Sequence, residues 1–266
     1  MKYRMILRMT LTITLMMTLT GLAFAEPPPV SDIIQRAEQA AYYAGKDGVA
    51  DVKMVIHDAS GGTRERTFRI LRWNGEDGQQ KFYVYFNGPA EVRRMAYLVW
   101  KHGQGRDDDR WLWLPSLGRV NRIAPGDKRT SFVGSDFVYE DVSGRNPADD
   151  THTLLEVTDT AYHIRSVPKD PGSVEFAHYE VWIDRETFLP VKAAYTDDRG
   201  DVYRRVTADE VEVIDGHPTV VVSTVEDLKR NSKTVNTFSN IRYDVGLSEN
   251  IFSERFLRRP PREAVQ

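Results

Sequence analysis

Short apolar runs, separated by turn residues about every ten positions, constrain the fold of this chain most strongly. They occur at residues 49–59, 64–75 and 80–89, and again repeatedly after residue 150. Gly61-Gly62 and the Gly-Glu-Asp-Gly segment at 75–78 supply turns between the first runs. About ten to twelve strands joined by such turns predict a mainly β, antiparallel meander or barrel. No linker rich in Gly, Ser or Pro divides residues 26–266, so we expect one domain.

One amphipathic helix should precede the strands. Within residues 31–45, apolar side chains recur at helical spacing, at Ile33, Ile34, Ala37, Ala40 and Ala41. Ser31 is the expected N-cap and Gly45 the expected stop. The apolar stripe requires that this helix lie on an apolar surface.

Residues 1–25 have the features of a cleaved signal peptide. A basic start is followed by an uncharged apolar stretch at 9–22 and the small-x-small tripeptide Ala23-Phe24-Ala25. The stretch is shorter than the roughly 20 residues that span a bilayer, and no later segment of the chain reaches that length. We therefore expect an exported protein without a transmembrane span in the mature chain, with the periplasm as its location.

Composition excludes several classes of protein. The formal net charge is −3, and loss of a basic leader makes the remainder more acidic, which is unsuitable for binding nucleic acid. The chain contains no cysteine, so it has neither a disulfide framework nor a lipidated N-terminal Cys.

The sequence offers no catalytic or metal-binding motif. Its six histidines are scattered, and neither HExxH, GxSxG nor a phosphate-binding glycine loop occurs. The acidic segments at 107–109 and 197–201 are expected to be solvated turns. We predict no enzyme activity, no catalytic residue, no metal and no cofactor.

Several central strands are apolar on both faces, which is unusual for a sheet with one solvated side. The runs at 82–86, 95–100 and 111–114 contain no charged residue. Either the second face is covered by other parts of the protein, or a curved sheet encloses an apolar cavity. The composition alone leaves both explanations open.

A motif in the middle of the chain resembles the signature of the LolA-like outer-membrane lipoprotein-sorting family. It comprises Trp-Leu-Trp-Leu-Pro at 111–115, Leu-Gly-Arg-Val at 117–120 with Arg122-Ile123, and Gly-Ser-Asp-Phe-x-Tyr-Glu-Asp at 134–141. The signal peptide, the opening helix and the closing segment are also similar to that family. The resemblance covers most of residues 26–266.

The resemblance implies an unclosed, strongly curved antiparallel β-barrel, a half-barrel with a few covering helices. It also implies a carrier that holds the acyl chains of a lipid or lipoprotein in an apolar cavity during transfer toward the outer membrane. An inner-membrane transporter or an outer-membrane acceptor would be its partner. The alternative is a periplasmic binding module that senses a lipid or polypeptide and contacts an inner-membrane regulator or transporter.

Side-chain alternation gives candidate residues for this cavity, if each strand has the assumed register. The expected lining residues are Phe82, Val84, Phe86, Leu98, Trp100, Leu112 and Leu114, with Phe137 and Tyr139 at the mouth.

The motif at 117–141 contains basic residues that do not form one patch. Arg119 and Arg122 are three apart, so in a strand they point to opposite faces. Asp136 is a possible N-cap for a short helical turn over 134–142, with Glu140 and Asp141 in its first turn. We expect this turn to lie at the rim of the barrel, as a movable lid or a fixed plug.

Overall fold

The computed structural model describes residues 26–103 and 106–265, and the expected signal peptide at 1–25 lies outside the described residues. The strands over the described residues are β1 (Asp47–His57), β2 (Thr63–Asn74), β3 (Gln80–Gly88), β4 (Ala96–Lys101), β5 (Asp109–Leu114), β6 (Arg119–Ile123), β7 (Asp150–Val157), β8 (Ala161–Pro168), β9 (His178–Asp184), β10 (Pro190–Thr196), β11 (Val202–Ile214), β12 (His217–Asp227) and β13 (Ser232–Tyr243). The α-helices are α1 (Val30–Tyr42), α2 (Tyr139–Ser143), α3 (Arg255–Arg258) and α4 (Arg262–Val265).

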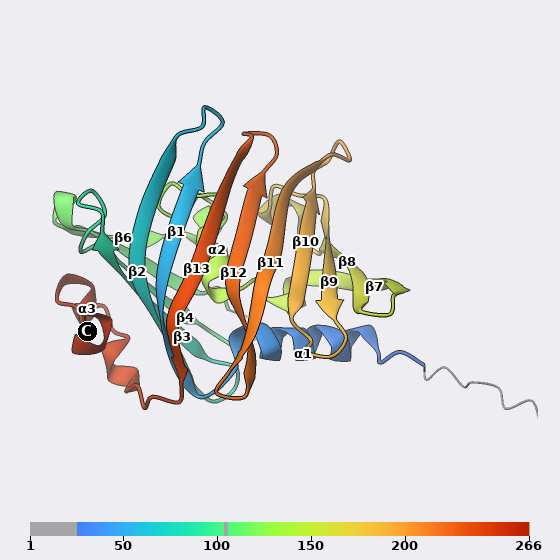
Figure 1. The fold of residues 1–266 in the computed structure, drawn as a ribbon, viewed down its shortest axis with the longest axis horizontal. Coiled ribbons are helices and arrows are strands. Elements are labelled where there is room, and N and C mark those ends of the chain that lie inside the picture. The colour runs from blue at the N-terminus through green and yellow to red at the C-terminus, as the bar shows by residue number, and fades with distance from the viewer. Residues whose placement is uncertain (1–25, 104–105, 266) are drawn as a thin grey trace, which may run out of the picture.

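All of these strands belong to one curved antiparallel sheet (Figure 1). Its order is β6-β5-β4-β3-β2-β1-β13-β12-β11-β10-β9-β8-β7, so the first and last strands of the chain pair in the middle. The edge strands β6 and β7 do not pair with each other within the described residues, and the barrel is therefore unclosed. This confirms the predicted mainly β half-barrel.

Helix α1 crosses one end of the concave face near β9 to β12 (Figure 1). It begins one residue before Ser31, whose side chain does not cap it; the N-cap is Pro29, whose carbonyl accepts from the amides of Asp32 and Ile33. The fixed φ of proline suits this entry into the helix. The helix ends at Tyr42, and Gly45 lies beyond it in the left-handed region with φ 66°.

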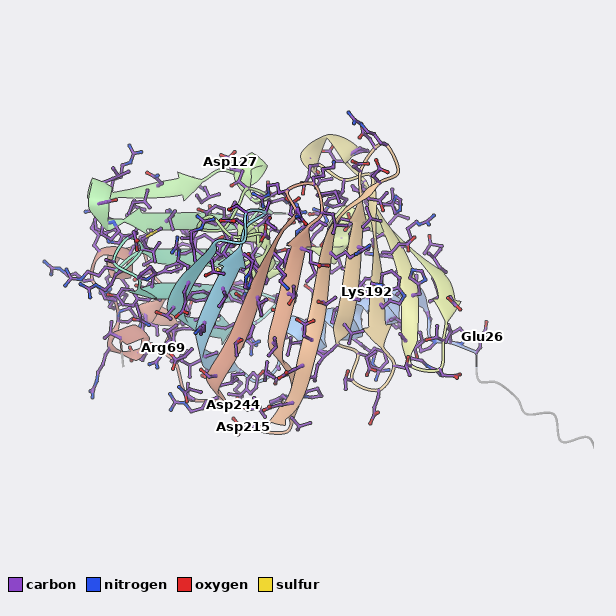
Figure 2. All side chains as sticks on the ribbon, turned by 45° about the horizontal axis from the view of Figure 1, so that its top comes forward. Glu26, Arg69, Asp127, Lys192, Asp215 and Asp244 are labelled. Atoms are coloured by element: carbon purple, nitrogen blue, oxygen red, sulfur yellow. The ribbon has the colours of Figure 1, made fainter. Side chains whose placement is uncertain are left out.

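The outer face of β2 to β5 is covered by the C-terminal segment. Helix α4 lies against β2 and β3, and α3 against β4 and β5. The buried side chains in this outer layer are Val49, Leu71, Tyr83, Ala96, Leu98, Trp111, Ile251, Phe252, Leu257 and Ala264. This layer explains why the runs at 82–86, 95–100 and 111–114 are apolar on both faces. Elsewhere the outer face is more polar, as at Arg69, which donates two hydrogen bonds to Asp51 (Figure 2).

The hairpin of β5 and β6 confirms the expected separation of two arginines. Arg119 lies opposite Leu114 and Arg122 opposite Trp111, so they occupy different faces. Arg122 forms an ion pair with Asp109. The segment therefore offers no single basic patch.

Candidate functional site

A cavity of about 490 Å³ occupies part of the concave face. Helix α1 forms one wall, and residues of β9 to β13 and of β1 to β3, with His152 of β7, form most of the rest. The segment from Phe132 to Arg145 closes one side. Its lining is predominantly aliphatic and aromatic, as in typical small-molecule sites, whose volumes are about 300–1,000 Å³.

One register row crosses the middle strands of the sheet and provides the floor. Met54 of β1 is opposite Asn236 of β13, Asn236 is opposite Ser223 of β12, and Ser223 is opposite Ala208 of β11. All four residues line the cavity. Directly opposed residues of antiparallel strands share a face, so the row forms one continuous surface.

Alanines on α1 keep the space beneath the helix open. Ala37, Ala40 and Ala41 line the cavity together with Ile34. The same helix is held on β8 and β9, because Ile33 and Ala37 pack with Ile164, Ile183 and their neighbours. Larger side chains at the alanine positions would occupy volume that a ligand could use.

Polar contacts fix the C-terminal end of α1 to the sheet. The Arg72 guanidinium donates to the carbonyls of Tyr42, at 2.7 Å, and of Ala44. Gln80 also donates to the Tyr42 carbonyl, at 2.7 Å. A cation at the end of a helix neutralises carbonyls that have no partner within the helix. This end of the cavity wall is therefore anchored.

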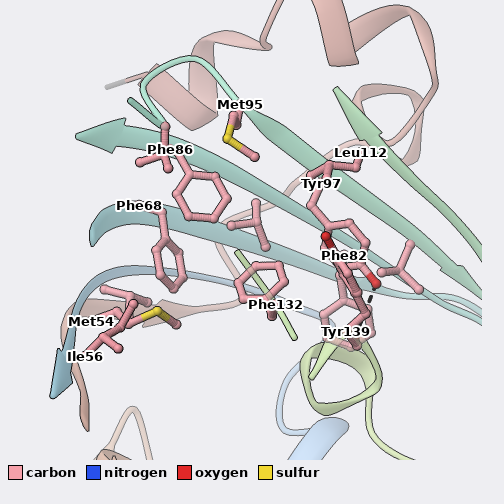
Figure 3. Close-up of a cluster of buried hydrophobic side chains, with 14 residues drawn as sticks. Met54, Ile56, Phe68, Phe82, Phe86, Met95, Tyr97, Leu112, Phe132 and Tyr139 are labelled. Carbon is pink, nitrogen blue, oxygen red and sulfur yellow. Dashed lines mark hydrogen bonds between the residues drawn. The ribbon is translucent and has the colours of Figure 1, made fainter. Parts of the chain in front are cut away.

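An aromatic plug fills the concave face over β2 to β4 (Figure 3). Phe132 is 2% exposed, and its ring centroid lies 5.8 Å from Phe86, 5.5 Å from Tyr97 and 5.6 Å from Tyr139. The Tyr97 hydroxyl donates to the Tyr139 carbonyl at 3.3 Å. We use "plug" for Phe132 and Tyr139, and "plug segment" for residues 124–143, which run from the end of β6 through α2.

Glu140, a buried carboxylate in the plug segment, pairs with three cationic side chains and so fixes the position of the segment. Glu140 is 3% exposed by its side chain and lies 3.1 Å from Arg129, 3.4 Å from Lys128 and 3.6 Å from Arg145. Burial would raise the pKa of Glu140, but the three cations outweigh it and hold that pKa below its ordinary value. Glu140 is thus an ionised, buried anchor.

Two further carboxylates tie the plug segment to the sheet. Asp136 accepts hydrogen bonds from Arg230 at 2.8 Å, Ser232 at 2.6 Å and Thr234 at 2.7 Å. Asp141 pairs with Arg204 at 2.5 Å.

The expected N-cap at Asp136 was wrong. Helix α2 begins at Tyr139, and Asp141 at its third position accepts from the amide of Val138 at 2.7 Å. The side chain of Asp136 is instead bound by residues from β13 and the turn before it, which a local sequence pattern does not reveal.

The structure separates the expected lining residues into three groups: those that line the cavity, those that pack around the plug, and two that face the outer layer. Phe82, Val84 and Phe137 line the cavity. Phe86, Leu112, Leu114 and Tyr139 lie on the same face but pack in or against the cluster around the plug.

The expectation for Leu98 and Trp100 was wrong in parity. Both belong to the outer layer beneath the C-terminal segment, and the Trp100 indole donates to the Phe252 carbonyl at 2.7 Å. Tyr97 and Val99 face the concave side in their place. The error is a one-residue register shift in β4, which turns each side chain to the other face.

Most of the cavity wall was missed by the sequence reasoning. Ala193 and Tyr195 of β10, Val206 of β11 and the floor residue Asn236 all line it. The alanine face of α1 was the available signal, because a helix lying on apolar strands through small side chains leaves space beneath it.

The acidic segment at 107–109 was expected to be a solvated turn, and for two of its residues this was wrong. Asp109 is 7% exposed and accepts from His102 and Arg106, each at 2.9 Å. Asp108 pairs with Arg110 at 2.6 Å. Across residues 26–103 and 106–265, no group of three or more His, Cys, Asp or Glu side chains is arranged to hold a metal ion.

Comparison with known proteins identifies the family. A family model described as an uncharacterized protein matches residues 78–259. The crystal structure of a DUF1329 family protein from Desulfovibrio piger ATCC 29098 is 30% identical; the match covers 85% of this chain and 96% of that chain, with a TM-score of 0.77. The chain belongs to the DUF1329 family. Among curated protein sequences, nothing matches this DUF1329 protein.

Two further structures connect this DUF1329 protein with the LolA-like fold. A putative outer membrane lipoprotein-sorting protein domain from Vibrio parahaemolyticus is 25% identical, covering 86% of this chain and 97% of that chain, with a TM-score of 0.78. A LolA superfamily protein from Nitrosomonas europaea is 18% identical, covering 85% and 98%, with a TM-score of 0.64, and shows the fold alone. The predicted resemblance to the LolA-like family is confirmed. No helix of the described residues is long and apolar enough to cross a membrane.

Proposed function

We propose that this DUF1329 protein carries a lipid, or the acyl chains of a lipoprotein, in the cavity beneath α1. The observation that carries the proposal is an apolar cavity of about 490 Å³ between α1 and the sheet. Carriage of this kind requires no covalent chemistry, so the protein would act as a binding protein and not as an enzyme.

The energetics of an acyl chain suit such a cavity. Transfer of each methylene from water to an apolar site is worth about 0.8 kcal/mol. Side chains such as Ile34, Val206 and Phe238 offer apolar surface without a charge that the chain would have to desolvate. A carrier must also release its cargo, which a groove with one open side permits more readily than a closed core.

Similar proteins support a role in lipoprotein sorting. The Vibrio parahaemolyticus structure is described as an outer membrane lipoprotein-sorting protein domain. We extend that role to this chain as a proposal, with transit through the periplasm after removal of residues 1–25. An inner-membrane transporter would load the carrier, or an outer-membrane acceptor would unload it.

Lipid analysis of the purified protein tests the proposal. The protein is expressed with its leader in a Gram-negative host, purified without detergent, extracted and examined by lipid mass spectrometry. We expect an acyl lipid in near-stoichiometric amount, and displacement of a fluorescent fatty acyl probe by the extracted lipid. A protein that is empty after purification and also fails to bind the probe would contradict the carrier function.

A further inference from the structure

A buried side-chain amide with an unpaired oxygen lies in the floor of the cavity. Asn236 is 6% exposed, lines the cavity, and its Oδ1 atom has no hydrogen-bond partner among the described residues. Its register neighbours are Met54 on one side and Ser223 on the other. The amide is therefore a polar position within an otherwise mostly apolar floor.

Thr234, a polar residue on the same face, differs from Asn236 because its side-chain oxygen has a hydrogen-bond partner within the protein. Thr234 lies two residues earlier on β13, is fully buried, and donates to Asp136 at 2.7 Å. Burying a polar group without a partner is costly, and valine or leucine at position 236 would avoid that cost. Thr234 helps to anchor the plug, whereas the Oδ1 atom of Asn236 has no hydrogen-bond partner among the described residues.

We propose that Asn236, assisted by Ser223, hydrogen bonds a donor group in the middle of the bound amphiphile. The inference rests on the proposed carrier function and narrows its ligand class. The donor is a hydroxyl or an amide N–H flanked by apolar segments. A side-chain amide offers both an acceptor and donors, so a hydroxyl or a secondary amide can pair with it completely. An ester offers acceptors alone and leaves Oδ1 unpaired.

Matched ligand pairs test this inference on the purified, delipidated protein. The first pair is 12-hydroxyoctadecanoic acid and octadecanoic acid. The second is 11-(octanoylamino)undecanoic acid and its ester analogue, 11-(octanoyloxy)undecanoic acid, whose central groups are flanked by methylenes on both sides. We expect the wild type to bind the donor-bearing member about tenfold more tightly in one pair, which then identifies the donor as hydroxyl or amide. Binding is measured by displacement of a fluorescent fatty acyl probe.

Variants at Asn236 and Ser223 test whether these floor residues cause the preference for the donor-bearing ligand. Asn236→Leu should abolish the preference while still binding octadecanoic acid, because it removes the amide and keeps the branched shape of the side chain. Ser223→Ala should reduce the preference by a smaller factor and provides a second variant if Asn236→Leu does not fold. Thr237→Val is the matched control, since Thr237 is the exposed neighbour of Asn236 on the same strand; it should keep the full preference.

Different outcomes separate this inference from the carrier function. Equal affinities within both pairs in a wild type that binds octadecanoic acid would overturn the role of Asn236 and leave the carrier function intact. A preference that survives in both Asn236→Leu and Ser223→Ala would also overturn it. A wild type that binds none of the four acids would contradict the carrier function itself, and this inference with it.

Discussion

The two halves of the concave face are built from the same sheet and filled in different ways. Over β2 to β4, the aromatic plug packs against Phe68, Phe86 and Tyr97, and the cavity borders this cluster at Phe68, Val84 and Phe132. Over β9 to β13, the covering element is α1, which presents alanines, and a cavity of about 490 Å³ lies beneath it. The same curvature thus produces a packed core on one side and a binding site on the other.

The difference lies in what covers the sheet. The plug segment is anchored by three carboxylates, Asp136, Glu140 and Asp141, each paired with a cation. Helix α1 is tied at its C-terminal end through Arg72 and faces the cavity with Ala37, Ala40 and Ala41. Substitutions in the plug should therefore change stability, and substitutions in the cavity should change ligand binding.

Removal of the plug's main ring should have the largest effect on stability. Phe132→Ala empties a site that is 2% exposed and surrounded by four aromatic rings. We expect the free energy of unfolding to fall by about 4 kcal/mol, as for other buried Phe→Ala changes. Urea denaturation measures it, and a loss below about 1 kcal/mol would show that the plug is not part of the core.

Neutralising the buried carboxylate of Glu140 should cause the second-largest loss of stability. Glu140→Gln leaves Lys128, Arg129 and Arg145 without their shared carboxylate, and we expect a loss of about 3 kcal/mol. Glu175→Gln is the control, because Glu175 also pairs with Arg129 but its side chain is 43% exposed. The control should lose about 1 kcal/mol or less; equal losses would contradict the anchoring role.

The same carboxylate gives a pH dependence. The pKa of Glu140 lies below its ordinary value of 4.5, so its contribution is fully present above that pH and is lost as the pH falls through the lowered pKa. Denaturation at a series of pH values should show wild-type stability decreasing below about pH 4.5 more steeply than that of Glu140→Gln. Parallel curves would indicate that Glu140 does not titrate in the way proposed.

Phe137 joins the two regions and should show a smaller, mixed effect. It is half-buried, packs against the plug cluster and lines the cavity. We expect Phe137→Ala to cost about 2 kcal/mol, less than a fully buried ring, and to weaken binding of an acyl probe. A normal stability combined with faster probe uptake and release would instead favour a movable lid at residues 134–142.

The sequence predicted the architecture better than the site. Regular turns were sufficient to predict an antiparallel meander or barrel, because strand rhythm is a local property. The half-barrel followed from the family resemblance of the motif at 111–141. The doubly apolar runs placed the predicted cavity over β3, β4 and β5. Their outer faces are apolar because Phe252 and Leu257, more than 130 positions later, cover them.

Long-range pairing also explains the remaining errors. The parity of Leu98 depends on how β4 registers with β3, where Leu98 is opposite Tyr83 and both face outward. The cavity wall in β10 to β13 alternates like an ordinary strand, so Ala193 and Asn236 are not distinguished by their local sequence. Only the placement of α1 over them turns that face into a cavity.

The most direct test of the account compares two adjacent alanines of β10. Ala193 faces the cavity, whereas Ala194 does not line it and lies opposite Glu180 and Arg205. A phenylalanine at 193 should fill space that a ligand needs, while the same change at 194 adds a ring elsewhere. With a fluorescent fatty acyl probe, we expect Ala193→Phe to weaken binding at least tenfold and Ala194→Phe to match the wild type. Equal binding by both folded variants would contradict the claim that this cavity holds the acyl chain.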